Sequence, residues 1–383
     1  MYVALLSVVS VHDRLPNTCL QEWKRALSAM KEGRVMHTSR GAGYFGRQGV
    51  VEGLTNAIIA DPRVFHISDQ DFLTMYNRQM MFEIAQTKAW TENGSRDVMK
   101  QVPERLRAEG WDVVRPALSL TVRGWIMRAF LEDNLKNNVV TALDFYTSAL
   151  EVLQWGQELY KDVPFSEKGQ IFQPTFIRGV KSLRLDAFMK AYKENPGPNS
   201  KFPLSELLAG ANELAADIGP VPDRPNHECI GFYLAFFPYA AGQAHALRAF
   251  YYHQTAMNLA KTEGLTEEVS ELYIKAGSEY KDAALKYYPV DDEHHPWFLY
   301  CAYNSHYDGG APARDLLDIL DRMKESIAPM GRIWEFTANA SAGRDQALMS
   351  ALAFRQQLLD KIAKGTIREQ DRVYRPGKYP VKK

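Results

Sequence analysis

The sequence predicts an all-α protein, and three observations favour this fold class. Apolar residues recur at intervals of three and four through most of the 383-residue chain. Alternating strand patterns bounded by hairpin turns are nearly absent. Segments with one spacing of small and aromatic residues recur along the chain, which is typical of packed helices. We therefore expect antiparallel helix pairs, stacked as a solenoid or as an irregular right-handed helical array.

The expected helices follow one another with short loops. In the first, Leu20, Trp23, Leu27 and Met30 lie on one face behind a candidate cap at 17–18. The second covers 49–60 and ends where a proline follows, and the third has its apolar face between 72 and 85. The remaining helices are expected at 98–109, 119–136, 139–160, 170–192, 204–217, 229–264 (with a bend), 266–288, 296–307, 312–327 and 341–364.

A proline-rich stretch interrupts the helical pattern near the middle of the chain. Six of the 19 prolines lie between 196 and 225, on both sides of the helix at 204–217. The stretch is either a hinge or an ordered crossover within one array. We therefore divide the chain into helical arrays at 1–192 and 228–370, a connection at 193–227 and a flexible tail at 371–383.

Charge and cysteine usage exclude several classes of protein. Lys+Arg and Asp+Glu both number 46, so no basic excess favours nucleic-acid binding. The three cysteines are far apart and form no CxxC pair, which argues against a disulfide framework. No apolar run is long enough for a membrane span, and no secretory signal is recognised. We expect an intracellular protein, cytoplasmic or nuclear, that acts without a membrane.

The recurring spacing is a small or apolar residue at offsets 0, 4 and 7, with an aromatic in the middle in the best copies. Four segments show it, and proline follows two of them. They are Ala142–Tyr146–Ala149, Ala276–Tyr280–Ala283, Val50–Leu54–Ala57 and Ala313–Leu317–Leu320. The pattern resembles the second helix of a tetratricopeptide repeat. Small residues allow close approach of two helices, and the aromatic fills the space between them.

The resemblance to tetratricopeptide repeats implies a concave surface, lined by first helices, that holds a segment of a partner protein. Matching positions place Arg128, Leu131 and Asn134 on this surface in one pair, and Phe298, Ser305 and His306 in the last. The Lys/Asn/Arg clamp with which some members hold acidic chaperone tails is not reproduced. The implied partner is an unidentified protein or peptide.

Three motifs suggest chemistry without reaching a site assignment. Gly41, Gly43 and Gly46 match G-x-G-x-x-G, but the preceding residues are too polar for a core strand, so a helix–helix loop is the interpretation. The acidic and histidine run at 291–297 is interpreted as a loop that caps the next helix, since adjacent residues cannot converge on one metal ion. His245 and His253 lie on one face of an apolar helix.

These observations predict a scaffold or adaptor that binds another protein. The alternative is a helical enzyme or small-ligand protein with its site near residues 227–253 and 294–306. No catalytic, cofactor-binding or metal-binding residue is assigned, and no cofactor is expected. An open groove would favour the scaffold, and a closed pocket with converging histidines and carboxylates would favour the enzyme.

Overall fold

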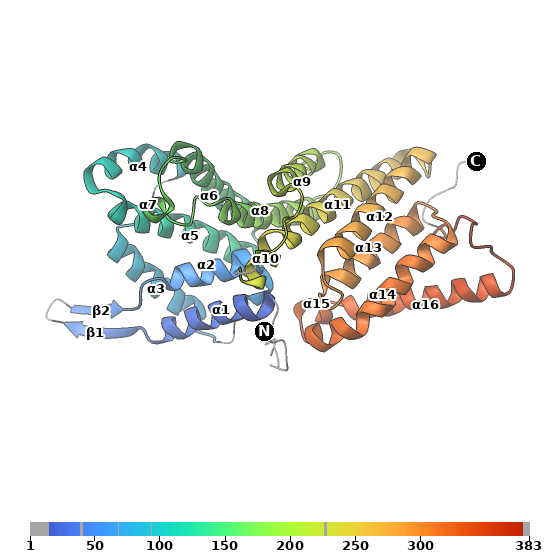
Figure 1. Ribbon diagram of the computed structural model, residues 1–383, viewed down its shortest axis with the longest axis horizontal. Helices are drawn as coiled ribbons and strands as arrows, with labels where there is room; N and C mark the ends of the chain where they lie inside the picture. The colour runs from blue at the N-terminus through green and yellow to red at the C-terminus, as the bar shows by residue number, and fades with distance from the viewer. Residues whose placement is uncertain (1–14, 39–40, 68, 93, 226–227, 378–383) are drawn as a thin grey trace. The chain divides into compact units, whose positions relative to one another are not determined.

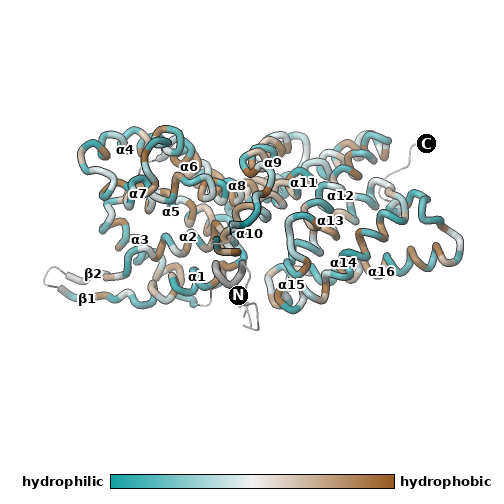
Figure 2. The backbone as a smooth tube through the Cα atoms, in the orientation of Figure 1, coloured by the Kyte–Doolittle hydropathy of each residue, from teal (hydrophilic) through white to brown (hydrophobic). Residues whose placement is uncertain are grey.

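The computed structural model describes residues 15–377 except 39–40, 68, 93 and 226–227 (Figure 1). The regular structure of these residues is helical apart from one two-stranded sheet, which confirms the all-α class. The chain divides into two compact units. The N-terminal unit comprises residues 15–191 and 224–236, and the C-terminal unit comprises 192–223 and 237–377. Apolar and polar residues alternate along the helices of each unit (Figure 2).

The N-terminal unit is built around α5, which packs against α6 and also contacts α2, α3 and α4. Its elements are α1 (Leu15–Lys31), β1 (Arg34–Thr38), β2 (Gly41–Phe45), α2 (Val50–Ala60), the 3-10 helix η1 (Pro62–Val64), α3 (Phe72–Thr87), α4 (Ser95–Glu109), α5 (Trp111–Lys136), α6 (Val139–Leu159), α7 (Phe165–Lys168), most of α8 (Pro174–Glu194) and α10 (Ile230–Phe236). Ala142 and Ala149 of α6 are completely buried, as the repeat spacing predicts. Small residues at these positions allow the two helices to approach closely.

A buried arginine joins three helices of this unit. The Arg123 side chain is 1% exposed, and its Nη1 donates to Thr55 Oγ1 at 2.6 Å and to Asn56 Oδ1 at 2.7 Å. Its guanidinium lies over the Phe176 ring, 4.9 Å from the centroid. Burial lowers the pKa of Arg123 to about 10. Because each donor has a nearby oxygen, the cation is held inside the helix packing.

The C-terminal unit is a row of helices in chain order. Its elements are α9 (Leu204–Ile218), α11 (Pro238–Glu263), α12 (Glu267–Tyr287), α13 (His294–Asp308), α14 (Ala313–Trp334), α15 (Ala338–Ser341) and α16 (Arg344–Ala363). From α11 to α14 each helix packs against the next, α9 covers α11, and α16 packs on α13 and α14. The connections are short, which makes successive helices antiparallel. Ala276 and Ala283 are completely buried in this row, as predicted.

The segment at 34–45 corrects the expected helix–helix loop. It is an antiparallel hairpin, β1–β2, in which Met36 pairs with Gly43 and Val35 with Tyr44. The strand was hard to recognise because the hairpin is not part of the core. Val35 and Met36 are each 52% exposed, so its residues show no buried alternation.

The expected single helix at 229–264 is two helices, α10 and α11. The break lies at Phe237, whose φ of −123° and ψ of −76° are not helical. Pro238 has no backbone N–H to continue the ladder and disfavours the helical conformation of the residue before it. The Phe236 carbonyl instead accepts from Arg178 Nη1 at 2.8 Å. The division between the two units falls at the same position.

Two smaller differences concern helix ends. The expected cap at 17–18 lies inside α1, which begins at Leu15. The helix expected at 312–327 continues to Trp334 through Pro329. None of the described helices combines the length and the hydrophobicity that a membrane span requires.

The described part of the expected flexible tail makes defined contacts with the C-terminal unit. Residues 371–377 run along the C-terminal unit, where Val373 N–H donates to Ala311 O at 3.0 Å and Ala313 N–H donates to Asp371 O at 3.0 Å. Arg372 forms an isolated antiparallel bridge with Pro312. The absence of helical periodicity correctly indicated a segment without helix, but its extended backbone is tied to the turn between α13 and α14. The rest of the expected tail lies outside the described residues.

Candidate functional site

The three predicted positions on α5 differ in exposure. Leu131 is buried, whereas Arg128 and Asn134 are exposed. Arg128 Nε lies 2.8 Å from Glu132 Oε1, and Asn134 Nδ2 donates to Phe130 O at 3.0 Å. Two of the three residues therefore face solvent, and both make contacts within their own helix.

The predicted positions on α13 are largely covered. Phe298 is half-buried and stacks on Tyr280 with ring centroids 6.0 Å apart. Ser305 is completely buried and His306 is 8% exposed. The His306 ring lies so close to Gly277 of α12 that a Cβ there would come within 1.9 Å of Nδ1. Ser305 and His306 are therefore packing residues between helices, and the expectation that they line an open surface is wrong.

The histidines of α11 hold neighbouring helices. His253 Nδ1 lies 2.9 Å from Ser305 Oγ, and that hydroxyl donates to Cys301 O at 3.0 Å. His245 Nδ1 lies 2.6 Å from a Glu279 oxygen whose partner oxygen accepts from Arg248 at 2.7 Å. These contacts join α11 to α12 and α13. The enzyme alternative would use the same histidine and carboxylate side chains.

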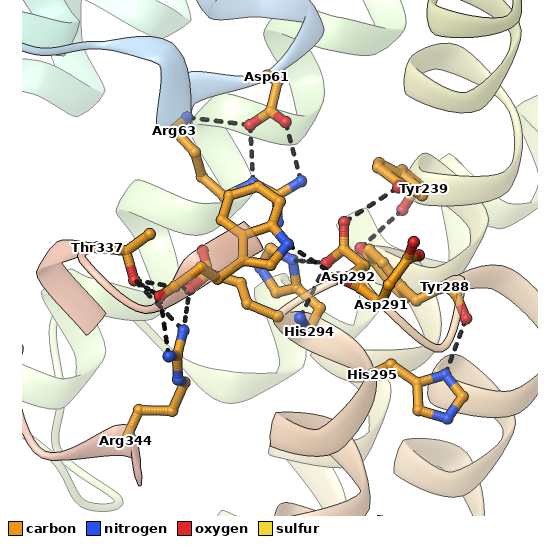
Figure 3. Close-up of polar contacts among 12 residues, drawn as sticks. Asp61, Arg63, Tyr239, Tyr288, Asp291, Asp292, His294, His295, Thr337 and Arg344 are labelled. Atoms are coloured by element: carbon orange, nitrogen blue, oxygen red, sulfur yellow. Dashed lines mark hydrogen bonds and ion pairs between the residues drawn. The ribbon is translucent and has the colours of Figure 1, made fainter. Parts of the chain in front are cut away.

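The expected loop at 291–297 is shorter than predicted, because residues 294–297 form the first turn of α13, and Asp292 caps that turn. Asp292 Oδ1 accepts from His294 N–H at 2.9 Å, and Asp292 Oδ2 accepts from Tyr239 Oη at 3.0 Å. Figure 3 shows the contacts of Asp292 with His294 and Tyr239. Glu293 forms an ion pair with Arg344 at 2.9 Å, in which both side chains are 3% exposed. Within the described residues, no group of three His, Cys, Asp or Glu is arranged to hold a metal ion.

A cavity of about 320 Å³ lies in the N-terminal unit, between α1, β2 and α3. Lys31, Tyr44, Asp71 and Arg78 are among its lining residues. Asp69, also in the lining, pairs with Lys31 at 3.4 Å. This cavity is outside the regions 227–253 and 294–306, so it does not supply the pocket that the enzyme alternative requires there.

Residues 369–377, near the end of the chain, contact the helices of the C-terminal unit, and we call them the strap. Arg375 Nε lies 2.5 Å from Asp308 Oδ1, and its Nη2 donates to Asn304 Oδ1 at 2.6 Å. The Arg375 guanidinium also lies over the Tyr307 ring, 4.8 Å from the centroid. The Asp308 side chain is 2% exposed, so this contact places a cation on a buried carboxylate.

Two further strap residues contact the start of α12 and the turn after α13. Arg372 donates to both oxygens of Glu267, at 3.1 and 3.3 Å. This hydrogen bonding lowers the pKa of Glu267. The Tyr374 ring lies against Gly310, where a Cβ would come within 1.9 Å of the ring. Gly310 also has a φ of +70°, so both its conformation and its lack of a side chain suit this turn.

We define the strap site as Glu267, Asn304, Asp308 and Gly310, with the backbone of residues 311–314. Its residues come from the start of α12, the end of α13 and the following turn. Sequence analysis missed the site because Arg372 and Glu267 are 105 positions apart. The available signal was the pattern of basic residues around an aromatic, Arg372-Val373-Tyr374-Arg375, in a segment without helical periodicity.

A pair of aromatic residues, one exposed and one half-buried, continues from the strap site along α13. Trp297 is 37% exposed and stacks on Tyr300, with ring centroids 5.4 Å apart. Tyr300, Asn304 and Asp308 follow at four-residue intervals, so they share a helix face with Trp297. We call Trp297, Tyr300, Asn304 and Asp308 the α13 stripe. It joins an aromatic surface to the groups that hold Arg375.

Comparisons with protein-family models, with curated proteins and with solved structures found no match to this chain.

Proposed function

We propose that the C-terminal unit is a protein-binding scaffold, tetratricopeptide-like in its helix pairs, whose site takes an extended segment of a partner protein. The proposal rests on the strap, because the unit already binds this extended segment of its own chain. Its backbone pairs with the turn after α13, and its side chains contact the strap site. A partner segment with the same chemistry would replace the strap or continue along the α13 stripe.

The two arginines of the strap differ in their expected contribution. The Arg372–Glu267 pair is exposed, with side chains 50% and 66% accessible, and exposed pairs contribute only about 0–1 kcal/mol. Asp308 is nearly inaccessible, so the Arg375 contact is far less screened by water. Arg375 is therefore the anchor, and the preferred partner carries an arginine beside a tyrosine.

Backbone hydrogen bonds supply the part of the affinity that does not depend on sequence. Val373 N–H and Asp371 O pair with the turn, as does Glu369 O with Arg314 N–H at 2.9 Å. Such strand-like pairing is a common mode of peptide recognition, in which side chains add the specificity. In the strap site this specificity comes from a buried carboxylate and a glycine that accommodates an aromatic ring.

A peptide-binding experiment tests the proposal. A fluorescent peptide with the sequence of residues 367–377 is titrated into the full chain and into its Arg372→Ala/Arg375→Ala variant. The variant weakens the resident strap, so we expect it to bind the peptide about tenfold more tightly than the wild type, because charge-assisted hydrogen bonds contribute about 1.5–3 kcal/mol. Anisotropy gives both affinities.

Two controls make the result specific. Arg368→Ala removes an arginine that pairs with Asp371 inside the strap, so it should leave peptide binding at the wild-type level. Asp308→Asn added to the double variant should abolish the gain. A double variant that keeps its helical circular dichroism but does not bind the peptide would contradict the proposal.

A further inference from the structure

The β1–β2 hairpin of the N-terminal unit exposes large apolar side chains. Val35 and Met36 are each 52% exposed and Phe45 is 48% exposed. The hairpin extends beyond the helices of its unit (Figure 1). Apolar residues concentrated on a projecting element mark an interaction surface more often than apolar residues scattered singly.

The strand register places these side chains on both faces of the hairpin. Met36 pairs with Gly43 and Arg34 with Phe45, so Met36 and Phe45 share one face. The Phe45 ring leans over Gly43, where a Cβ would lie 3.4 Å from Cε2, and this brings the ring beside Met36. Val35 pairs with Tyr44 on the opposite face.

The base of the hairpin is fixed to the helices behind it. Tyr44 Oη lies 3.3 Å from Gln79 Oε1, and the Tyr44 ring packs edge-on against Phe82 at 6.2 Å. Gln79 Nε2 donates to Arg47 O at 2.5 Å. The hairpin is therefore held in place by α3 while its apolar side chains remain accessible.

The hairpin is also basic in a chain with no net charge. Residues 33–51 contain Arg34, Arg40, Arg47 and His37 and no Asp or Glu. Arg34, His37 and Arg47 are exposed. Glu32, just before this segment, pairs with Arg47 at 3.3 Å in an exposed contact that salt and solvent screen. The local excess of positive charge is complementary to an anionic surface.

We propose that this hairpin seats the N-terminal unit on the surface of an anionic phospholipid bilayer. Val35, Met36 and Phe45 enter the interfacial region, and the flanking arginines contact lipid phosphates. Arg34 pairs with Phe45 and is exposed, so a cation and an apolar ring lie together at the helix end of the hairpin. An anionic bilayer surface offers both phosphates and apolar chains to such a combination.

Vesicle co-sedimentation of the full chain tests this proposal. We expect the protein to sediment with vesicles of phosphatidylserine and phosphatidylcholine, and about tenfold less with pure phosphatidylcholine. Met36→Ala/Phe45→Ala should reduce sedimentation with the anionic vesicles about tenfold. Leu159→Ala/Phe165→Ala removes apolar side chains of matched exposure (53% and 56%) elsewhere in the unit and should sediment like the wild type.

A second readout keeps the test decisive if the double alanine variant is unstable. In a Phe45→Trp variant, the added tryptophan should be quenched by brominated lipids in anionic vesicles, in excess of any quenching of the wild type. Wild-type protein that stays in the supernatant, or an added tryptophan that is not quenched, would overturn the proposal. Binding of an oligonucleotide or self-association through the hairpin, without vesicle binding, would overturn it as well.

Discussion

Arg123 in the N-terminal unit and Arg375 in the C-terminal unit make closely similar contacts in different settings. Each guanidinium lies over an aromatic ring, at 4.9 Å from Phe176 and at 4.8 Å from Tyr307 respectively, and donates to side-chain oxygens. Arg123 is 1% exposed within the helix packing, whereas the Arg375 side chain is 33% exposed on a terminal segment. The same chemistry is a fixed part of the core in one unit and a partly exposed contact in the other.

The largest expected effect comes from removing the fixed arginine. Arg123→Ala should lower the free energy of unfolding by about 1–3 kcal/mol for each acceptor that it leaves without a donor, Thr55 Oγ1 and Asn56 Oδ1. Urea unfolding followed by circular dichroism measures the change. Arg123→Lys should recover only part of the lost free energy, since an ammonium cannot reproduce the planar arrangement of donors in a guanidinium. A loss below about 1 kcal/mol would show that the Arg123 contacts contribute little to the stability of the unit.

The packing of the C-terminal row provides the second test. Ala283 is completely buried, so Ala283→Leu should overpack the row and cost about 1–3 kcal/mol. Ala353, an exposed residue of α16, provides the matched control, and Ala353→Leu should change the melting temperature little. Equal melting temperatures for the two variants would contradict the close helix approach at Ala283.

The partly exposed arginine should have a local effect. Arg375→Ala should speed hydrogen exchange of the Val373 amide about tenfold or more, because the strap loses its anchor while the helices keep their packing. The global melting temperature should change much less than in Arg123→Ala. Exchange at Val373 that matches the wild type would place the anchor of the strap elsewhere and weaken the comparison with Arg123.

The smallest expected effect concerns pH. Burial lowers the pKa of His306 below its ordinary value of 6.5. The unfolded chain therefore binds a proton near that pH while the folded chain does not, so the free energy of unfolding falls as pH drops below about 6.5. His306→Gln should flatten this part of the stability profile, measured by urea unfolding at a series of pH values. An unchanged slope would assign the acid sensitivity to other groups.

Local patterns were sufficient to predict most helices. α12 spans Glu267–Tyr287 where 266–288 was predicted, and α9 spans Leu204–Ile218 where 204–217 was predicted. The burial of Ala276 and Ala283 followed from their spacing alone. These features depend on residues a few positions apart, whose relative geometry a helix determines. The division of one expected helix at Phe237 depended on packing as well, because a proline permits a bend or a break.

The candidate site and the hairpin depended on the tertiary structure. Arg375 and Asp308 are 67 positions apart, and no periodicity relates an extended segment to the helix end that receives it. Ser305 and His306 show the same limit of sequence-based prediction. The helix face on which they lie was predictable, but their burial against α11 and α12 was not. The amino-acid sequence by itself determined an all-α chain, most of its helix spans and its small packing residues, since these follow from local periodicity. Only the tertiary structure decided which charged and aromatic side chains meet, because those contacts depend on how distant segments pack.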